Sequence, residues 1–216
     1  GRAIYIGIIK DNEAEIMIPI ETKLLAKFKR NPGEYALHQC PDWSGDNKVV
    51  FMSFMTGGGD LYILDLNEDL WQENTQSPEA RILTGKDTEN IRKNLVRLTN
   101  NPNLDTQPRW TSDSKKIVYL AETENNTDIF YIDLERSYNQ FRAIGNAFAS
   151  KPKPITNDEN SETNPTCSPD DKLIAFYSTE KNVENILSDE LSFQTADLWF
   201  TELTEPIKPP KKIASN

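Results

Sequence analysis

The sequence predicts an all-β fold, a β-propeller of four-stranded antiparallel blades, and three observations lead to this prediction. A block with Pro, an aromatic residue or Cys, and a turn Asp occurs three times; a block that begins with Asp follows each copy, and a short block closes each unit. Each unit therefore predicts four strands. A single twisted sheet cannot cover both of its faces, so repeated sheets of this kind stack radially against their neighbours.

The first block predicts two strands joined by a tight turn. Its copies align without gaps: "PDWSGDNKVVFM" from Pro41, "PRWTSDSKKIVY" from Pro108 and "PTCSPDDKLIAF" from Pro165. Pro is expected at the start of the first strand, where it gives up only a terminal ladder bond. The alignment makes three lysines equivalent: Lys48, Lys115 and Lys172. The residue before each Lys is expected to take a positive φ, which Asn and Asp tolerate. These residues are Asn47, Ser114 and Asp171.

The second block predicts the third strand, and the closing block predicts the fourth. The second block is "DLYILDL" from Asp60, "DIFYIDL" from Asp128 and "DLWFTEL" from Asp197, and the closing copies are "LVRLTNN", "KPITND" and "KKIASN". The N-terminal "RAIYIGIIKDNEAEIMIPIE" matches a second and third strand with one gap, and "KFKRNP" follows where a fourth belongs. We expect a single domain over residues 1–216. It contains a partial unit at 1–31, which lacks the innermost strand, and complete units at 32–101, 102–158 and 159–216.

The aromatic positions of the repeat are expected to pack between neighbouring blades. They are equivalent from unit to unit: Trp43, Trp110 and Cys167 in the first block, and Tyr62, Phe130 and Trp199 in the second. Packing is favoured over stacking on a ligand, because buried aromatic side chains most often serve the core.

Composition narrows the classes of partner. The chain has 216 residues and a formal net charge of -10, so it repels phosphate backbones and anionic lipid headgroups. We expect no nucleic-acid partner. We also expect no membrane insertion, because no apolar run approaches the roughly 18 residues that span a bilayer. A protein or peptide is the expected partner. Cys40 and Cys167 are expected to be buried thiols rather than a disulfide or a reactive site.

Catalytic and metal-binding residues find little support in the sequence. His38 is the only histidine and is expected to be structural, although it lies near a predicted innermost strand. Neither a nucleophile elbow nor a phosphate-binding Gly-rich loop is present. The turn residues Asp46, Asp113 and Asp170 lie on different blades, so they cannot share an ion and are expected to bond local backbone amides. We predict no catalytic residue, no metal and no cofactor.

Candidate partner-binding residues lie in three long links between strands. They are apolar or aromatic side chains: Trp71, Tyr138, Phe141, Ile186, Leu187 and Phe193. Long loops with apolar spots on a rigid scaffold are typical binding devices. The alternative is that these links cover their own blades.

The repeat resembles the TolB-like, or WD-like, β-propeller family. That family combines Pro-x-Trp-Ser-Pro-Asp-Gly-Lys, an apolar strand, Asp-Ile-Tyr-x-x-Asp-Leu and a closing Leu-Thr; "CSPDDKLIAF" comes closest in the turn and "PRWTSDSKKIVYL" around the Trp. No copy keeps the turn Gly. The resemblance covers residues 41–216 and, more weakly, those before them. It implies a non-enzymatic module for protein or peptide interaction in the cell envelope, periplasmic or otherwise extracytoplasmic.

Two other functions stay open. Related propellers serve as the gating domain of prolyl-oligopeptidase-like serine peptidases or host carbohydrate lyases. The chain is alternatively the propeller part of a hydrolase or carbohydrate-active enzyme with a site at the central channel. A homo-oligomer is the third possibility. Blade number is open too, since propellers of the family commonly have six blades. The chain is a four-bladed ring, which we favour, a fragment of a larger ring, or a protomer that completes a ring with another chain.

Overall fold

The protein consists of antiparallel β-sheets wherever the structure describes it. This computed structural model describes residues 4–10, 13–20, 37–66, 94–124, 126–134, 151–179, 196–203 and 207–214. Every regular element within those ranges is a β-strand, and the strands form one two-stranded and three four-stranded sheets. The predicted all-β class and the four-stranded blades are confirmed.

Each sheet is one blade, with its strands in chain order. Blade 1 comprises β1 (Ile4–Lys10) and β2 (Glu13–Ile20), and blade 2 comprises β3 (His38–Trp43), β4 (Lys48–Ser53), β5 (Asp60–Asp65) and β6 (Leu95–Arg97). Blade 3 comprises β7 (Asp105–Trp110), β8 (Lys116–Glu122), β9 (Thr127–Asp133) and β10 (Lys153–Pro154). Blade 4 comprises β11 (Ser161–Cys167), β12 (Leu173–Thr179), β13 (Asp197–Glu202) and β14 (Lys211–Ala214). The fourth strand expected at "KFKRNP" lies outside the described residues.

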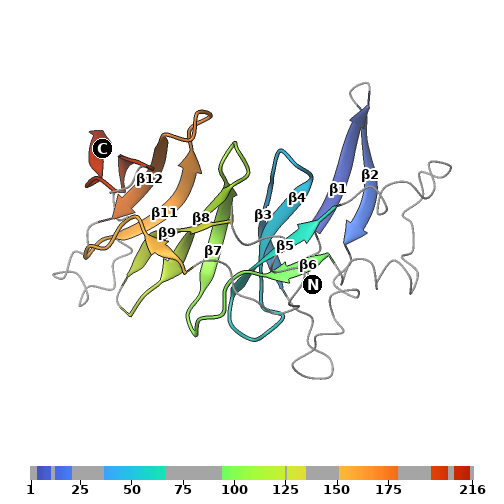
Figure 1. The fold of residues 1–216 in the computed structure, drawn as a ribbon, viewed down its shortest axis with the longest axis horizontal. Coiled ribbons are helices and arrows are strands. Elements are labelled where there is room, and N and C mark those ends of the chain that lie inside the picture. Colours follow the sequence, from blue (N-terminus) through green and yellow to red (C-terminus); the bar gives the residue numbers. More distant parts are fainter. Residues whose placement is uncertain are drawn as a thin grey trace, which may run out of the picture.

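The blades stand side by side in an open row (Figure 1). Contacts follow the chain: β7 touches β3, β4 and β5 of blade 2, and β11 touches β7, β8 and β9 of blade 3. Blades 1 and 4 lie at opposite ends of the molecule's long axis. The described sheets therefore do not close the four-bladed ring that we favoured from the sequence, because ring closure requires the last blade to pack against the first.

The repeat Pro lies inside the first strand rather than at its start. The strands begin upstream of it, at His38, Asp105 and Ser161. A β-bulge interrupts the register at this place in each blade. The residue before each Pro has a positive φ: 52° at Cys40, 48° at Gln107 and 52° at Asn164. The expected strand start is wrong because the bulge leaves a residue out of the ladder, so Pro, which has no N–H, is tolerated within the strand.

The first turn of blade 2 is one residue shorter than its counterparts. The cross-strand pairs that follow the turns are Trp43–Val49, Trp110–Ile117 and Cys167–Ile174. Lys48 therefore corresponds to Lys116 and Leu173, and the gapless match with Lys115 and Lys172 is wrong. A shift of one residue moves every side chain of a strand to the opposite face. Strand pairing, rather than sequence alignment, thus decides which residues share a blade face.

The turn residues take the backbone conformation expected from the sequence. Their φ angles are positive: 64° at Asn47, 57° at Ser114 and 57° at Asp171. Asn and Asp reach this left-handed region more readily than other residues with a Cβ atom. The missing turn Gly is therefore compatible with the turn.

Replacing Asn47 with Val should lower the free energy of unfolding by about 1 to 2 kcal/mol, because a β-branched residue is strained at this φ. Asn47→Gly should leave it unchanged or slightly higher, since Gly adopts the conformation freely. Equilibrium urea unfolding measures both variants. Asn47 is exposed, so an equal loss in both would point to a missing side-chain contact and contradict the conformational argument.

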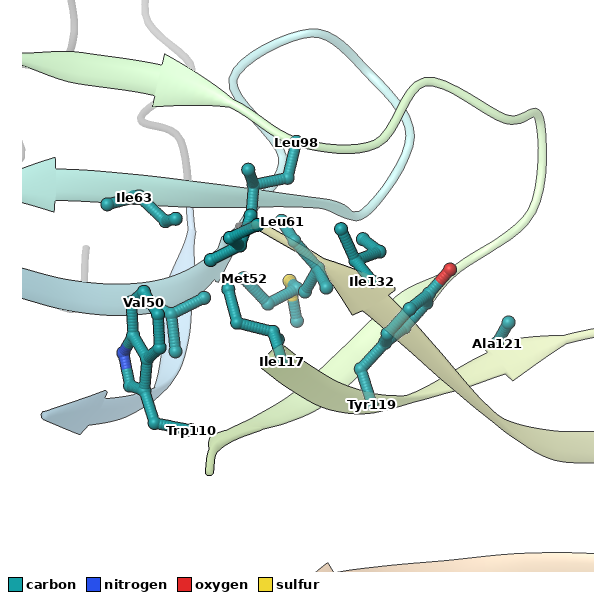
Figure 2. Packing of buried hydrophobic residues seen from close by; sticks show 11 residues of the cluster. Val50, Met52, Leu61, Ile63, Leu98, Trp110, Ile117, Tyr119, Ala121 and Ile132 are labelled. Carbon is teal, nitrogen blue, oxygen red and sulfur yellow. The ribbon is translucent and has the colours of Figure 1, made fainter. Parts of the chain in front are cut away.

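Two hydrophobic clusters fill the seams, the packed interfaces between neighbouring complete blades. The seam of blades 2 and 3 (Figure 2) joins Val50, Met52, Leu61, Ile63 and Leu98 to Trp110, Ile117, Tyr119 and Ile132. The seam of blades 3 and 4 joins Val118, Leu120, Ile129, Tyr131 and Ile155 to Ile174 and Phe176. Burial of these side chains between sheets provides the main stabilisation of the stack.

Five of the six predicted packing positions lie in or against the core. Trp110 and Tyr62 are 7% and 4% exposed, and three others are partly buried against the clusters: Phe130, Cys167 and Trp199. Trp43 is the exception, with 44% of its surface exposed. Its counterpart Trp110 lies on β7, which packs against β3 and β4 of the preceding blade. Among the described residues, blade 1 has no innermost strand that could cover Trp43 in the same way. The packing role predicted for Trp43 is therefore wrong.

Candidate functional site

The six partner-binding candidates predicted from the sequence lie outside the described residues. They are Trp71, Tyr138, Phe141, Ile186, Leu187 and Phe193. Their role stays a prediction. Within the described residues, the features that could take part in catalysis or binding are His38, the two thiols, the turn carboxylates, the acids at the seams and an uncovered sheet face.

His38 is a buried and uncharged side chain. It begins β3, is 3% exposed and packs edge-on against Phe51 with ring centroids 5.7 Å apart. Burial lowers its pKa to about 4. Neither ring nitrogen has a hydrogen-bond partner among the described residues. A catalytic histidine needs substrate access and an orienting partner, so this environment fits the structural role predicted for His38.

The two thiols are free and half-buried. Burial raises the pKa of Cys167 to about 12, and the nearby carboxylates of Asp171 and Asp42 add to the rise. A thiol with such a pKa holds almost no thiolate at neutral pH, and the thiolate is the nucleophile. The thiols are unpaired, as expected, although their burial is partial.

The turn carboxylates serve their own turns, and two of the three accept hydrogen bonds from backbone amides as predicted. Asp113 accepts a hydrogen bond from the Lys115 amide at 3.0 Å, and Asp170 accepts one from the Lys172 amide at 3.2 Å. Asp46 accepts one from the serine hydroxyl of its turn at 2.6 Å. In the part of the chain that the structure describes, no group of three or more His, Cys, Asp or Glu side chains could hold a metal ion.

A fully buried acid begins the first strand of blade 3. Asp105 is 0% exposed, and its two oxygens accept hydrogen bonds from the Asn101 side-chain amide at 3.0 and 2.8 Å. Burial raises the pKa of Asp105 to about 6, and the charge of Asp60 adds to the rise, whereas hydrogen bonds from Asn101 and Thr99 oppose it. Asp60 itself is ion-paired with Arg97 at 2.8 Å.

Glu162 holds the equivalent position in blade 4 and is 1% exposed. It accepts hydrogen bonds from the Ser178 hydroxyl at 3.0 Å and from the Thr156 hydroxyl at 3.1 Å. The same Thr156 oxygen lies 3.3 Å from Asp128, yet one hydroxyl has a single proton to donate. Burial raises the pKa of Glu162 to about 7, and the charges of Asp158 and Asp128 add to the rise. This seam therefore favours a protonated Glu162 below neutral pH.

The two seam acids and His38 occupy one position of the repeat. His38, Asp105 and Glu162 lie opposite equivalent residues of the second strands: Ser53, Ala121 and Ser178. The acids were not among the sequence candidates. Their signal is a titratable residue three positions before each repeat Pro. Because the two acids lie inside packed seams, they influence the stability of the stack.

Blade 4 turns an apolar sheet face to solvent. Each blade has one face that points toward the next blade along the chain, and we call this the following face. It has five positions: two on the second strand, two on the third and one at the end of the fourth. They are Val50, Met52, Leu61, Ile63 and Leu98 in blade 2; Val118, Leu120, Ile129, Tyr131 and Ile155 in blade 3; and Ala175, Tyr177, Leu198, Phe200 and Ile213 in blade 4.

The five positions are buried in blades 2 and 3 and open in blade 4. In blades 2 and 3 no member is more than 6% exposed. In blade 4, Tyr177 is 44% and Ile213 is 54% exposed, and the other three are half-buried. Leu173, on the same strand as Tyr177, is 38% exposed. A contiguous apolar face of this kind is a candidate interaction surface.

The sheet arrangement is shared with solved structures of propeller proteins. TolB from Acinetobacter baumannii matches with a TM-score of 0.52 and 18% identity, over 82% of this chain and 32% of that chain. A puromycin-hydrolyzing peptidase of Mycobacterium tuberculosis matches with a TM-score of 0.59 and 10% identity, over 100% of this chain and 30% of that chain. This chain has a TolB-like β-propeller fold.

The propeller fold occurs in enzymes as well as in TolB. An oligogalacturonate lyase in complex with manganese matches with a TM-score of 0.53 and 10% identity, over 99% of this chain and 47% of that chain. The propeller blades of this chain thus span about a third to a half of the length of these proteins. No protein-family model and no curated protein matches the sequence. No helix in the described part of the propeller is long and apolar enough to cross a membrane.

Proposed function

We propose that the chain is a non-enzymatic propeller module that binds a protein partner through the following face of blade 4. The observation that carries the proposal is the contrast between equivalent positions: Leu120 is 2% exposed in blade 3, whereas Tyr177 is 44% exposed in blade 4. A protein with a net charge of -10 keeps this face apolar. An exposed apolar sheet face suits protein contact better than a small polar ligand. An extracytoplasmic location, which the repeat's resemblance implies, is part of the proposal.

Affinity capture from an extract of the source cells tests the proposal. Tyr177→Lys should abolish capture of the specific partner, because a charge would be buried at the centre of the interface. Trp43→Lys is the matched control, since Trp43 is also 44% exposed but lies on blade 2. Capture that survives Tyr177→Lys, or that both variants lose equally, would contradict the assignment to blade 4. Cell fractionation tests the location.

A second candidate is the propeller part of a peptidase or lyase. The observation that favours it is the likeness to two enzymes, each of which is more than twice as long as the part that this chain matches. In that case the following face of blade 4 would be covered within the enzyme. Hydrolysis of a peptide, or eliminative cleavage of an oligogalacturonate, by the purified chain, unaffected by Tyr177→Lys, would support this candidate against the first.

A further inference from the structure

We propose that the seam of blades 3 and 4 is a joint held closed by one proton, which Asp128 and Glu162 share through the hydroxyl of Thr156. Loss of this proton above neutral pH loosens blade 4 from blade 3, whereas the seam of blades 2 and 3 stays closed. The proposal goes beyond the proposed function, because it concerns the packing between two described blades rather than an exposed face.

A single hydroxyl links the two carboxyls. The Thr156 oxygen lies 3.1 Å from Glu162 Oε2 and 3.3 Å from Asp128 Oδ1, and it accepts a hydrogen bond from the Ile129 amide at 2.8 Å. Since a hydroxyl donates only one proton, one carboxylate faces a lone pair of Thr156 when both acids are ionised. If either acid is protonated, it donates to the Thr156 oxygen, which donates to the other. All three side chains are at most 3% exposed, so an unmatched carboxylate is costly here.

The seam of blades 2 and 3 has the same three groups but adds a cation. Its two acids and its hydroxyl come from Asp60, Asp105 and Thr99, and Thr99 accepts the Leu61 amide at 3.0 Å as Thr156 accepts its counterpart. Arg97 forms an ion pair with Asp60 at 2.8 Å. Arg97 pairs with β5 at the place where Pro154 pairs with β9. Since Pro154 carries no charge, Asp128 lacks the cation that Asp60 has.

The residue four positions before the seam acid also differs between the two seams. In the seam of blades 2 and 3 it is Asn101, whose side-chain amide donates to both oxygens of Asp105 at 3.0 and 2.8 Å. In the seam of blades 3 and 4 it is Asp158, whose negative charge adds to the effect of burial in raising the pKa of Glu162 to about 7. An amide donor and a cation in one seam are thus replaced by a third acid and a proline in the other.

The charges that act on Glu162 are both negative, those of Asp158 and Asp128. β11 packs against β7, β8 and β9 and pairs with β12, which carries no charged residue. The cations nearby lie elsewhere or are paired: Arg109 of β7 acts on Cys167 at the other end of β11, Lys116 of β8 lies opposite Asp133, Lys153 of β10 lies over the Tyr131 ring, and Lys212 of β14 is ion-paired with Asp197 of β13. The remaining charged groups on these strands and on the link before β11 are acids: Asp105, Glu122 and Glu159.

The sign of the effect follows from the raised pKa of Glu162. The closed seam holds the proton below about pH 7, so closure is favoured there and is weakened as the pH rises through 7. The same seam carries the contacts of β11 with β7, β8 and β9. Its loosening therefore releases blade 4 as a unit while blades 2 and 3 remain packed.

Two buried valines at one position of the repeat report on the two seams separately. Val118 lies in the seam of blades 3 and 4 and Val50 in that of blades 2 and 3, and both are 0% exposed. Each is replaced by Cys, a small apolar residue that the core should accept. Maleimide labelling is read by peptide mass, which separates the reporter from Cys40 and Cys167, and is divided by the labelling rate of the urea-unfolded chain at the same pH. We expect this opening ratio to rise about tenfold at Val118→Cys between pH 6 and pH 8, and to exceed that at Val50→Cys throughout.

Exchanging the residues that differ between the seams gives a matched pair of variants. Asp158→Asn places an amide donor beside Glu162 and should reduce the rise at Val118→Cys to about threefold or less. Asn101→Asp should make the opening ratio at Val50→Cys increase more steeply with pH. Asp158 and Asn101 are exposed, and the side-chain oxygen of each accepts the backbone amide two residues further on, at 2.8 and 3.1 Å. Both replacements keep that oxygen, so both variants should fold.

Three results would overturn the proposal. Equal opening ratios at the two reporters at every pH would mean that blade 4 separates only when the whole protein unfolds. An opening ratio at Val118→Cys that is independent of pH would show that no proton closes the seam. A rise that persists unchanged in Asp158→Asn would show that the acids around Glu162 are not its cause. None of these measurements involves a partner protein, so such a failure is distinct from a failure of the proposed function, which partner capture decides.

Discussion

The free energy of unfolding should fall as the pH rises from about 4 to about 8, because two buried carboxyls hold protons in the folded state. The folded pKa is about 6 for Asp105 and about 7 for Glu162, against ordinary values of 3.8 and 4.5. The folded chain therefore binds more protons than the unfolded chain in this interval, and stability decreases as pH rises. The contribution is complete below the ordinary values and is lost above pH 7, at on the order of 3 kcal/mol for each carboxyl.

Glu162→Gln isolates one of these contributions. The Gln amide carries no charge; its oxygen accepts a hydrogen bond from one of the two hydroxyls, Ser178 or Thr156, and its NH2 group donates to the oxygen of the other. The variant should therefore be more stable than the unsubstituted chain at pH 8 and show a flatter pH profile. Urea unfolding at a series of pH values measures this. Asp170→Asn is the control of opposite sign: local hydrogen bonds lower the pKa of the exposed Asp170 to about 2, so its stabilisation is present at pH 8. If Glu162→Gln left the pH dependence of the unfolding free energy unchanged, burial of Glu162 in the seam would not be the cause of that dependence.

Leu120→Ala should cost about 2 to 5 kcal/mol of unfolding free energy, whereas Tyr177→Ala should cost no more than about 1 kcal/mol. The two residues occupy one position of the repeat, opposite Ile129 and Leu198. The next blade buries Leu120 to 2% exposure, and Tyr177 remains 44% exposed. Truncating Leu120 leaves a cavity in a packed seam, but truncating Tyr177 removes a side chain that already contacts water. Urea unfolding of both variants in the isolated chain measures the difference.

Ile155 and Ile213 provide a second comparison with identical residues. Ile155 is 6% exposed in the seam of blades 3 and 4, and Ile213 is 54% exposed at the end of blade 4. Ile155→Ala should be the more costly change by at least about 1 kcal/mol. Equal costs within both pairs would mean that the following face of blade 4 is covered in the isolated chain, and would remove the basis of the proposed docking surface.

The sequence predicted the strands well because their signals are local. Turn residues such as Asp171 bond their own backbone and tolerate a positive φ, and β-branched and aromatic runs favour strands. The repeat then multiplied the same signal in three units. The bulge at Pro41 escaped prediction, because its cause is the pairing of β3 with β4 rather than the conformation of the residues themselves. The shorter turn at Lys48 was likewise hidden, since a gapless alignment satisfies the residue pattern although the strand faces are reversed.

The candidate site was only partly accessible to sequence reasoning. The long links between strands could be identified, but the six residues in them lie outside the described part of the chain. The acids Asp105 and Glu162 were overlooked because a carboxyl near the start of a strand is ordinary in a sequence. The pKa of each acid is raised by the neighbouring blade, which buries the carboxyl and places other negative charges near it. The difference in exposure between Leu120 and Tyr177 likewise depends on whether a neighbouring blade covers the residue.

By itself the sequence determined the repeating unit of this protein. It gives four strands, their order, the turn chemistry and the pattern of apolar residues that makes both faces of each sheet apolar. These properties follow from short-range backbone preferences and side-chain periodicity. Only the tertiary structure decided which faces are covered, where the row of blades remains open and which carboxyls hold a proton. Burial depends on the neighbour rather than on the residue, so Val118 and Ala175 can occupy one place in the repeat while only Val118 is sealed within a seam.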